Sequence, residues 1–196
     1  KDGTFSEVLC DALMNEWCAG ADCYIDLHGG DLRENVSKFS IYQRTDDADL
    51  EARGRMMAMC FDAELVVGLP NDHMERPGRP PTGFARHGEG VLNVARTLGI
   101  LGTPQTPFRN ARVACRDYLW VDCPVAGEFH AEIEPGMRVE KDQRLGTIRD
   151  LFGDTLAEIA APETGFLLWR MTHPSIAKGA PVLAVAVEEA LPSARL

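Results

Sequence analysis

The sequence has no long apolar run, no excess of basic residues and no signal-peptide pattern at its start. Without an apolar stretch of about 18 or more residues, no helix is expected to cross a bilayer. The 20 Lys and Arg against 30 Asp and Glu give a net charge of −10, which argues against nucleic acid as a partner. These features predict a cytoplasmic protein with no membrane partner.

Clustered cysteines are also missing. The six cysteines are scattered, and no two form a C-x-x-C pair. This pattern predicts reduced thiols, because a zinc–thiolate knot needs clustered ligands. The 196 residues, 45% of them apolar, are enough for one large domain or two small ones.

The most informative stretch is Y-I-D-L-H-G-G-D, residues 24–31. A β-prone run, predicted as a strand over Asp22–Leu27, ends in a histidine and two glycines. Ligands of α/β sheets collect beyond the carboxyl ends of strands. A neutral imidazole is a common zinc ligand, and a nearby carboxylate orients its ring. We therefore consider His28 a candidate metal ligand with Asp26 as its orienting partner; the alternative is a loop histidine with a structural role.

The rest of the first half predicts helices alternating with short strands. Thr4 and Glu7 have the spacing of a capping box, and the apolar residues that follow, as far as Trp17, predict a helix packed on the core. Asp46 and Asp47 predict the start of a second helix. Further short strands are expected over Phe39–Tyr42 and Glu64–Val67.

The second half changes from helical to alternating periodicity after Pro104–Pro107. Short β-rich runs separated by turn residues predict a compact barrel or sandwich. The predicted strands are Ala111–Arg116, Tyr118–Asp122, Glu128–Ile133, Arg144–Ile148, Leu156–Ile159, Gly165–Trp169 and Pro181–Val187.

Three features occur in this order: D-L-H-G-G at residues 26–30, G-V-L-N-V-A-R-T-L-G-I-L at residues 90–101, and the β-rich spacing of the second half. Together they resemble the succinylglutamate desuccinylase/aspartoacylase family. These are zinc amidohydrolases related to the M14 carboxypeptidases. The resemblance implies an M14 carboxypeptidase-like α/β fold followed by a small all-β barrel-sandwich domain. It also implies Zn²⁺ as cofactor, His28 as its third ligand, and loops of the β-domain, with Glu163 and Arg170 as candidates, that help select the acyl group.

The sequence departs from the family pattern in two places. The family's glutamate-bearing segment, of the form P-A-I-T-V-E-L-G-G, is missing before residue 84; Glu89 could replace that general base, although its helical context favours a helix surface. The sequence also opens on Lys1, directly before an Asp-Gly-Thr that the family carries well inside the chain. We therefore expect further strands, with the other two ligands and the base, before Lys1 and within residues 68–82.

The sequence thus predicts three parts: residues 1–103, the C-terminal portion of a zinc-hydrolase α/β domain; a linker at 104–107; and a β-domain at 108–196. The implied function is zinc-dependent hydrolysis of the amide bond of an N-acyl amino acid or similar small molecule. The alternative is a catalytically inactive small-molecule-binding protein on the same scaffold. The oligomeric state is left open, a homo-oligomer being one alternative.

Overall fold

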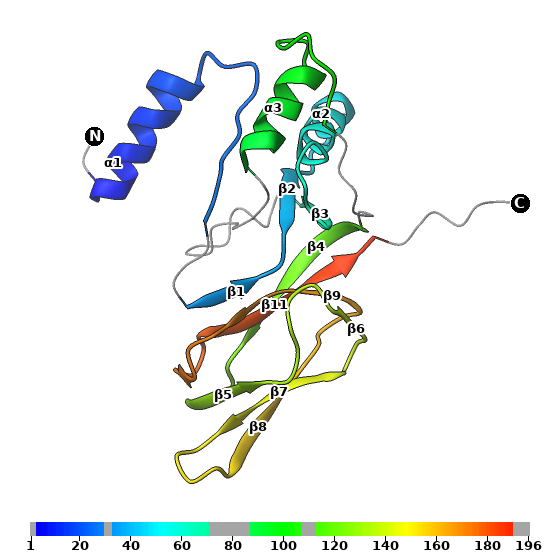
Figure 1. The fold of residues 1–196 in the computed structure, drawn as a ribbon. Helices are drawn as coiled ribbons and strands as arrows, with labels where there is room; N and C mark the ends of the chain where they lie inside the picture. Colours follow the sequence, from blue (N-terminus) through cyan, green and yellow to red (C-terminus); the bar gives the residue numbers. More distant parts are fainter. Residues whose placement is uncertain (1–2, 30–32, 71–86, 107–112, 190–196) are drawn as a thin grey trace, which may run out of the picture.

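The computed structural model describes residues 3–29, 33–70, 87–106 and 113–189 (Figure 1). Within them, helices and strands alternate in the first half and strands alone occupy the second. In chain order the elements are α1 (Phe5–Ala12), η1 (Leu13–Cys18, π-helical), β1 (Glu34–Val36), β2 (Phe39–Gln43), α2 (Ala48–Ala58), β3 (Leu65–Leu69), α3 (His87–Thr97), β4 (Val113–Asp122), β5 (Gly127–Ala131), β6 (Arg138–Val139), β7 (Arg144–Arg149), β8 (Thr155–Ala160), β9 (Gly165–Met171), β10 (Ser175–Ile176) and β11 (Pro181–Glu188).

The larger sheet is mixed and joins strands from both halves of the chain. Its order is β1-β9-β11-β4-β3-β2, with β6 paired to β9 as a seventh strand. β2 and β3 are parallel, β3 and β4 are parallel, and the remaining pairs are antiparallel. Residues 104–107 come after β3 and before β4 in the chain, and β3 and β4 are paired. The predicted linker therefore connects two neighbouring strands of one sheet. The division into two domains stays a prediction.

The smaller sheet packs against the larger one in the order β10-β5-β7-β8. A core of apolar side chains lies between the two, with Leu145, Ile148, Leu167, Val182 and Leu183 inaccessible to solvent or nearly so. Most strands of the second half lie where the pattern predicted them, but the two strands predicted over Ala111–Arg116 and Tyr118–Asp122 are one continuous strand, β4. The central strand β11 is buried on both faces. The described residues from 113 to 170 contain no helix.

Helix α2 covers one face of β2 and β3, and α3 packs against the residues that follow α2. Asp47 caps α2, with its carboxylate accepting from the N–H groups of Asp49 and Leu50 at 3.0 Å each. Phe61, after α2, packs with Val94 of α3. The predicted α/β character of the first half is confirmed, since its strands belong to a mixed sheet accompanied by helices. A second sheet lies beyond the mixed one.

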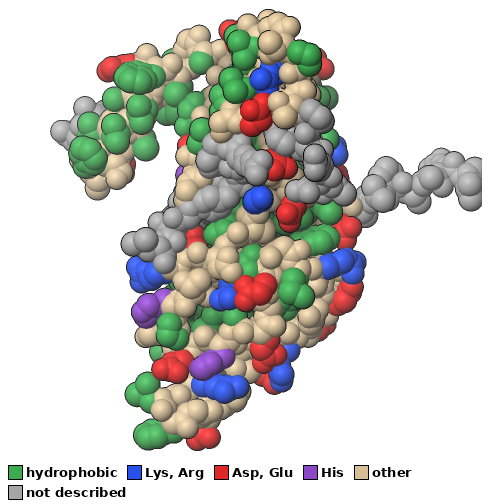
Figure 2. All heavy atoms as spheres, in the orientation of Figure 1, with side chains coloured by type: hydrophobic (Ala, Val, Ile, Leu, Met, Phe, Trp, Pro, Cys, Tyr) green, Lys and Arg blue, Asp and Glu red, His purple; other side chains and the backbone are tan. Residues whose placement is uncertain are grey.

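Helix α1 forms as predicted, but its expected packing on the core is wrong. The capping box is present, because Thr4 N–H donates to Glu7 at 2.7 Å and Glu7 N–H donates to the Thr4 hydroxyl at 3.4 Å. Phe5 is 82% exposed, however, and Trp17 is 77% exposed. Figure 2 shows hydrophobic side chains gathered over this helix. Periodicity predicts that a helix has an apolar face, but does not say what covers it.

No helix in the described part of the chain is long and apolar enough to cross a membrane. The further strands predicted before Lys1 and within residues 68–82 lie outside the described residues, apart from the end of β3 at Gly68 and Leu69.

Candidate functional site

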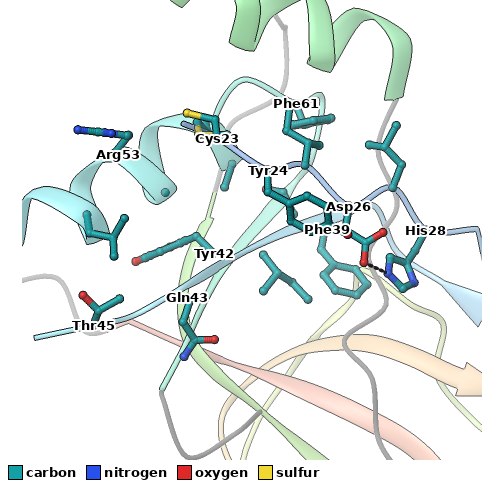
Figure 3. A pocket seen from close by; sticks show the side chains of 18 of the residues that line it. Cys23, Tyr24, Asp26, His28, Phe39, Tyr42, Gln43, Thr45, Arg53 and Phe61 are labelled. Atoms are coloured by element: carbon teal, nitrogen blue, oxygen red, sulfur yellow. Dashed lines mark hydrogen bonds and ion pairs between the residues drawn. The ribbon is translucent and has the colours of Figure 1, made fainter. Parts of the chain in front are cut away.

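The segment Asp22–His28 is extended but forms no strand in the described structure, so the strand predicted over Asp22–Leu27 is wrong. A β-strand needs a hydrogen-bonded neighbour. The facing strand is β2, and a cavity separates it from this segment (Figure 3). The sequence of this segment is β-prone, but no strand among the described residues forms a hydrogen-bonded ladder with it.

His28 and Asp26 are in direct contact. The Nε2 atom of His28 lies 2.7 Å from an Asp26 carboxylate oxygen. Residues two apart on an extended chain project to the same side, which explains why this spacing brings them together. The side chain of His28 is 30% exposed and that of Asp26 57% exposed, so the pair lies at the surface and can be approached by a ligand.

The cavity next to this pair has a volume of about 540 Å³. Asp22–His28 forms one wall, and β2 with α2 forms the other (Figure 3). Its walls are mostly apolar, and its polar side chains include Ser40, Gln43, Thr45 and Arg53. Sequence reasoning missed these four residues. Ser40 and Gln43 lie on β2, Thr45 follows it and Arg53 is on α2, and no sequence pattern reveals that such separate positions border one cavity.

Two tyrosines of the cavity have altered acidity. Burial raises the pKa of the Tyr24 phenol above its ordinary value, and the nearby Asp26 charge adds to the effect. Burial also raises the pKa of Tyr42. Both phenols therefore keep their protons at neutral pH and can donate a hydrogen bond.

The described residues fit only part of a zinc site. A catalytic zinc site needs three protein ligands and an open position. An imidazole with a carboxylate against one of its ring nitrogens fits one ligand with its orienting partner, as predicted for His28 and Asp26. Among the described residues, no group of three His, Cys, Asp or Glu side chains could hold a metal ion. The remaining ligands are not among them.

Three other candidates lie elsewhere. Glu89 is on α3, where its carboxylate accepts from Arg96 at 2.6 Å and from the Thr106 hydroxyl at 2.5 Å; it does not line the cavity. The helix-surface interpretation is thus the better one. Arg170 donates to Glu134 at 2.7 Å, and Glu163 accepts from Lys141 at 3.0 Å. Neither lines the cavity, and their role in acyl selection stays a prediction.

Comparison with known proteins places the fold. No protein-family model and no curated protein matches the chain. Solved structures do match over almost all of it. The product-bound ectoine utilization protein EutE (DoeB) from Ruegeria pomeroyi is 20% identical, with a TM-score of 0.76 over 95% of this chain and 64% of that one. A succinylglutamate desuccinylase/aspartoacylase from Rhodobacter sphaeroides is 23% identical, with a TM-score of 0.77 over 96% and 65%.

The fold is that of the succinylglutamate desuccinylase/aspartoacylase family. A third match, an aspartoacylase family protein from Mesorhizobium loti, agrees at 18% identity and a TM-score of 0.70 over 96% of this chain and 64% of that one. The family resemblance seen in the sequence is thereby confirmed for the fold. The chain spans slightly less than two thirds of the length of these structures.

Proposed function

We propose that this chain belongs to a zinc-dependent hydrolase that cleaves the amide bond of an N-acyl amino acid or a similar small molecule. His28 would be one zinc ligand, and Asp26 would orient it. The observation that carries the proposal is the 2.7 Å contact between these two residues at the edge of an open cavity, in a chain with this family's fold. The names succinylglutamate desuccinylase and aspartoacylase support the reaction class.

The residues present would act mainly by positioning. The Asp26 carboxylate would fix the ring orientation of His28 and increase its basicity as a ligand. A zinc ion, when bound, would act as a Lewis acid toward the amide carbonyl and lower the pKa of a bound water toward about 7. Arg53, which lines the cavity, is a candidate for the substrate carboxylate, because a guanidinium binds that group through two parallel hydrogen bonds.

The proposal has three further parts. The fold would divide into an M14 carboxypeptidase-like α/β part and a barrel-sandwich part at residues 104–107. The protein would act in the cytoplasm on a small-molecule substrate, without nucleic acid or membrane partners. A homo-oligomer is compatible with the proposal and is not required by it.

The test is metal analysis combined with hydrolysis. The protein is expressed from the longest reading frame that contains this chain, and that frame is inspected for an H-x-x-E pair and a further glutamate-bearing segment. Zinc is measured after dialysis, and amine release is followed with N-succinylglutamate and an N-acylaspartate. The matched control is His173→Ala, since His173 is an exposed histidine whose Nδ1 lies 3.1 Å from the carbonyl oxygen of Ser175.

We expect the His28→Ala variant to lose both bound zinc and hydrolytic activity while its fold stays intact. The His173→Ala variant should keep both zinc and activity. Full zinc occupancy in His28→Ala would exclude the ligand role. If the wild-type protein neither binds zinc nor releases amine, the enzyme proposal is overturned in favour of an inactive binding protein on the same scaffold.

A further inference from the structure

The cavity beside His28 is elongated and follows strand β2. It is lined by every residue of β2, from Phe39 to Gln43, and by Thr45 beyond the strand. At about 3.3 Å per residue, the strand alone gives the cavity a length of roughly 13 Å. In Figure 3, Phe39 lies on the side of the Asp26–His28 pair, whereas Gln43 and Thr45 lie on the opposite side. The candidate zinc ligand is therefore at one end of the cavity.

Apolar side chains line the cavity between its two ends. Ile41 comes from β2, Ile25 from the facing extended segment, Met57 from α2 and Phe61 from the residues after α2. A carboxylate held against these side chains would lose its hydration and gain no partner from them, which is costly in free energy. The middle of the cavity therefore suits an apolar chain.

Arg53 lies at the other end of the cavity from His28 (Figure 3) and is the one arginine or lysine among the described residues that line it. Two nearby arginines are engaged. Arg44 Nε is 3.8 Å from a Glu51 carboxylate oxygen. Arg55 of α2 is 4.0 Å from a Glu189 carboxylate oxygen.

Arg53, in contrast, forms no ion pair with a described residue, and it is exposed. A guanidinium at the rim of a cavity can bind a carboxylate that stays partly hydrated. The walls also carry the carboxylates of Asp22 and Asp26, so the cavity as a whole does not attract anions. An anionic group of the ligand is therefore favoured at Arg53 alone.

We propose that the substrate of this site has an extended apolar acyl chain that ends in a carboxylate, with its amide at His28 and its carboxylate at Arg53. This inference rests on the proposed function, because it takes His28 as the place where the amide binds. It adds the class of acyl group, which an apolar middle between one candidate metal ligand and one free guanidinium selects.

A succinyl group is too short for this arrangement. Three bonds separate its two carboxyl carbons, a reach of about 3.8 Å, as between consecutive Cα atoms. Its carboxylate would lie among the apolar walls and near Asp26, whose like charge disfavours it further. A suberoyl group has six methylenes between its carboxyl carbons and therefore carries its carboxylate much closer to the far end of the cavity.

Binding of three simple amides to the protein, measured by titration calorimetry after zinc has been removed with a chelator, tests the acyl chain. The probes are the monoamide of suberic acid, the monoamide of succinic acid and octanamide. We expect the suberic monoamide to bind at least about tenfold more tightly than the succinic one, because each buried methylene strengthens binding by about fourfold. Octanamide should bind about threefold to tenfold more weakly than the suberic monoamide, because it has no carboxylate for Arg53.

Two pairs of variants on and beside α2 locate the ligand. Arg53→Gln should reduce the affinity for the suberic monoamide to that for octanamide, and leave octanamide binding unchanged. Its control, Arg55→Gln, should change neither, since Arg55 does not line the cavity. Met57→Gln should weaken both ligands by about threefold or more. Its control is Met59→Gln, because Met59 is 42% exposed and lies outside the cavity walls.

The inference is overturned if the succinic monoamide binds as tightly as the suberic one, or if each control variant has the same effect as its partner. Its failure can be told apart from failure of the proposed function. Tight binding of the suberic monoamide by a protein that hydrolyses no amide when loaded with zinc would remove the proposed function and keep the acyl-chain inference. Hydrolysis of N-succinylglutamate without binding of the suberic monoamide would do the reverse.

Discussion

Gly90 on α3 packs its backbone against the aromatic ring of Phe61. A Cβ atom at Gly90 would lie 2.1 Å from the Cδ1 atom of that ring, closer than any stable contact allows. Phe61 is itself buried, with 8% of its surface exposed, so the ring has little space to move away. The glycine therefore sets how closely α3 approaches the end of α2 and the wall of the cavity.

Gly90→Ala is expected to destabilise the protein by about 1–3 kcal/mol, because overpacking outweighs the gain of roughly 1 kcal/mol in helix propensity. Gly88→Ala on the same helix is the control, since nothing lies within 4 Å of the added Cβ there. We expect that variant to be neutral or slightly stabilised. Chemical denaturation of both proteins measures the difference, and equal stabilities would contradict the packing argument.

Asp26→Asn is expected to weaken zinc binding about 10–100-fold, as loss of an orienting carboxylate typically does. The change keeps the size of the side chain but removes the charge against His28. Asp22→Asn serves as the control, because Asp22 lies on the same extended segment and lines the same cavity. Zinc affinity is measured by competition with a chelating dye; a similar loss in both variants would indicate a general charge effect instead of a specific contact.

Glu89 should make stability depend on pH in the acid range. Hydrogen bonds from Thr106 and then Arg96 hold the pKa of Glu89 below its ordinary value of 4.5. A carboxyl group whose pKa is lowered by folding stabilises the native state above its unfolded-state pKa, and loses that effect as the pH falls through the folded-state value. Glu89→Gln should thus melt at a lower temperature than wild type at pH 7, with the difference shrinking below about pH 4.5. A difference that is constant over pH 3–7 would contradict this role.

Cys115 should resist thiol reagents until the protein unfolds. Burial, and secondarily the charges of Glu188 and Glu189, raise the pKa of its thiol to about 12 from 9.0. A group with a raised pKa stabilises the fold below its unfolded-state pKa, and this effect is lost as the pH rises from about 9 towards 12. At pH 8 a disulfide reagent should label the exposed Cys10 and spare Cys115, as read by mass spectrometry of peptides. Equal labelling of both would show that β4 opens readily.

The second half of the fold follows closely from the sequence because its signals are local. The turn residues that separate its β-rich runs include Gly136, Gly153 and Gly179, and all three have positive φ, between 80° and 93°. Apolar residues between such turns are buried on one face of β5 and β8 and on both faces of β11. The positions of β5, β7, β8, β9 and β11 agree with the prediction.

The first half was less predictable because its outcome depends on neighbours. The sequence of Asp22–Leu27 is as β-prone as that of β2, yet only β2 has a ladder partner in the described residues. The apolar face of α1 was equally clear, and its Phe5 is nevertheless 82% exposed. For the site, the spacing of Asp26 and His28 indicated their contact, whereas the cavity beside them arises from the relation of two distant segments and has no sequence signal.

The pairing of β1 with β9 also has a consequence for protein synthesis. Glu34 lies opposite Met171, so roughly 135 residues separate the two partners along the chain. At about 5–20 residues per second, the ribosome would need roughly 7 to 30 seconds to deliver β9 after β1 has been made. During that interval β1 has no strand to pair with among the described residues already made, and a ribosome that pauses between β3 and β9 would lengthen it. Because β1 waits this long for its partner, we expect slower translation between β3 and β9 to lower the yield of folded protein.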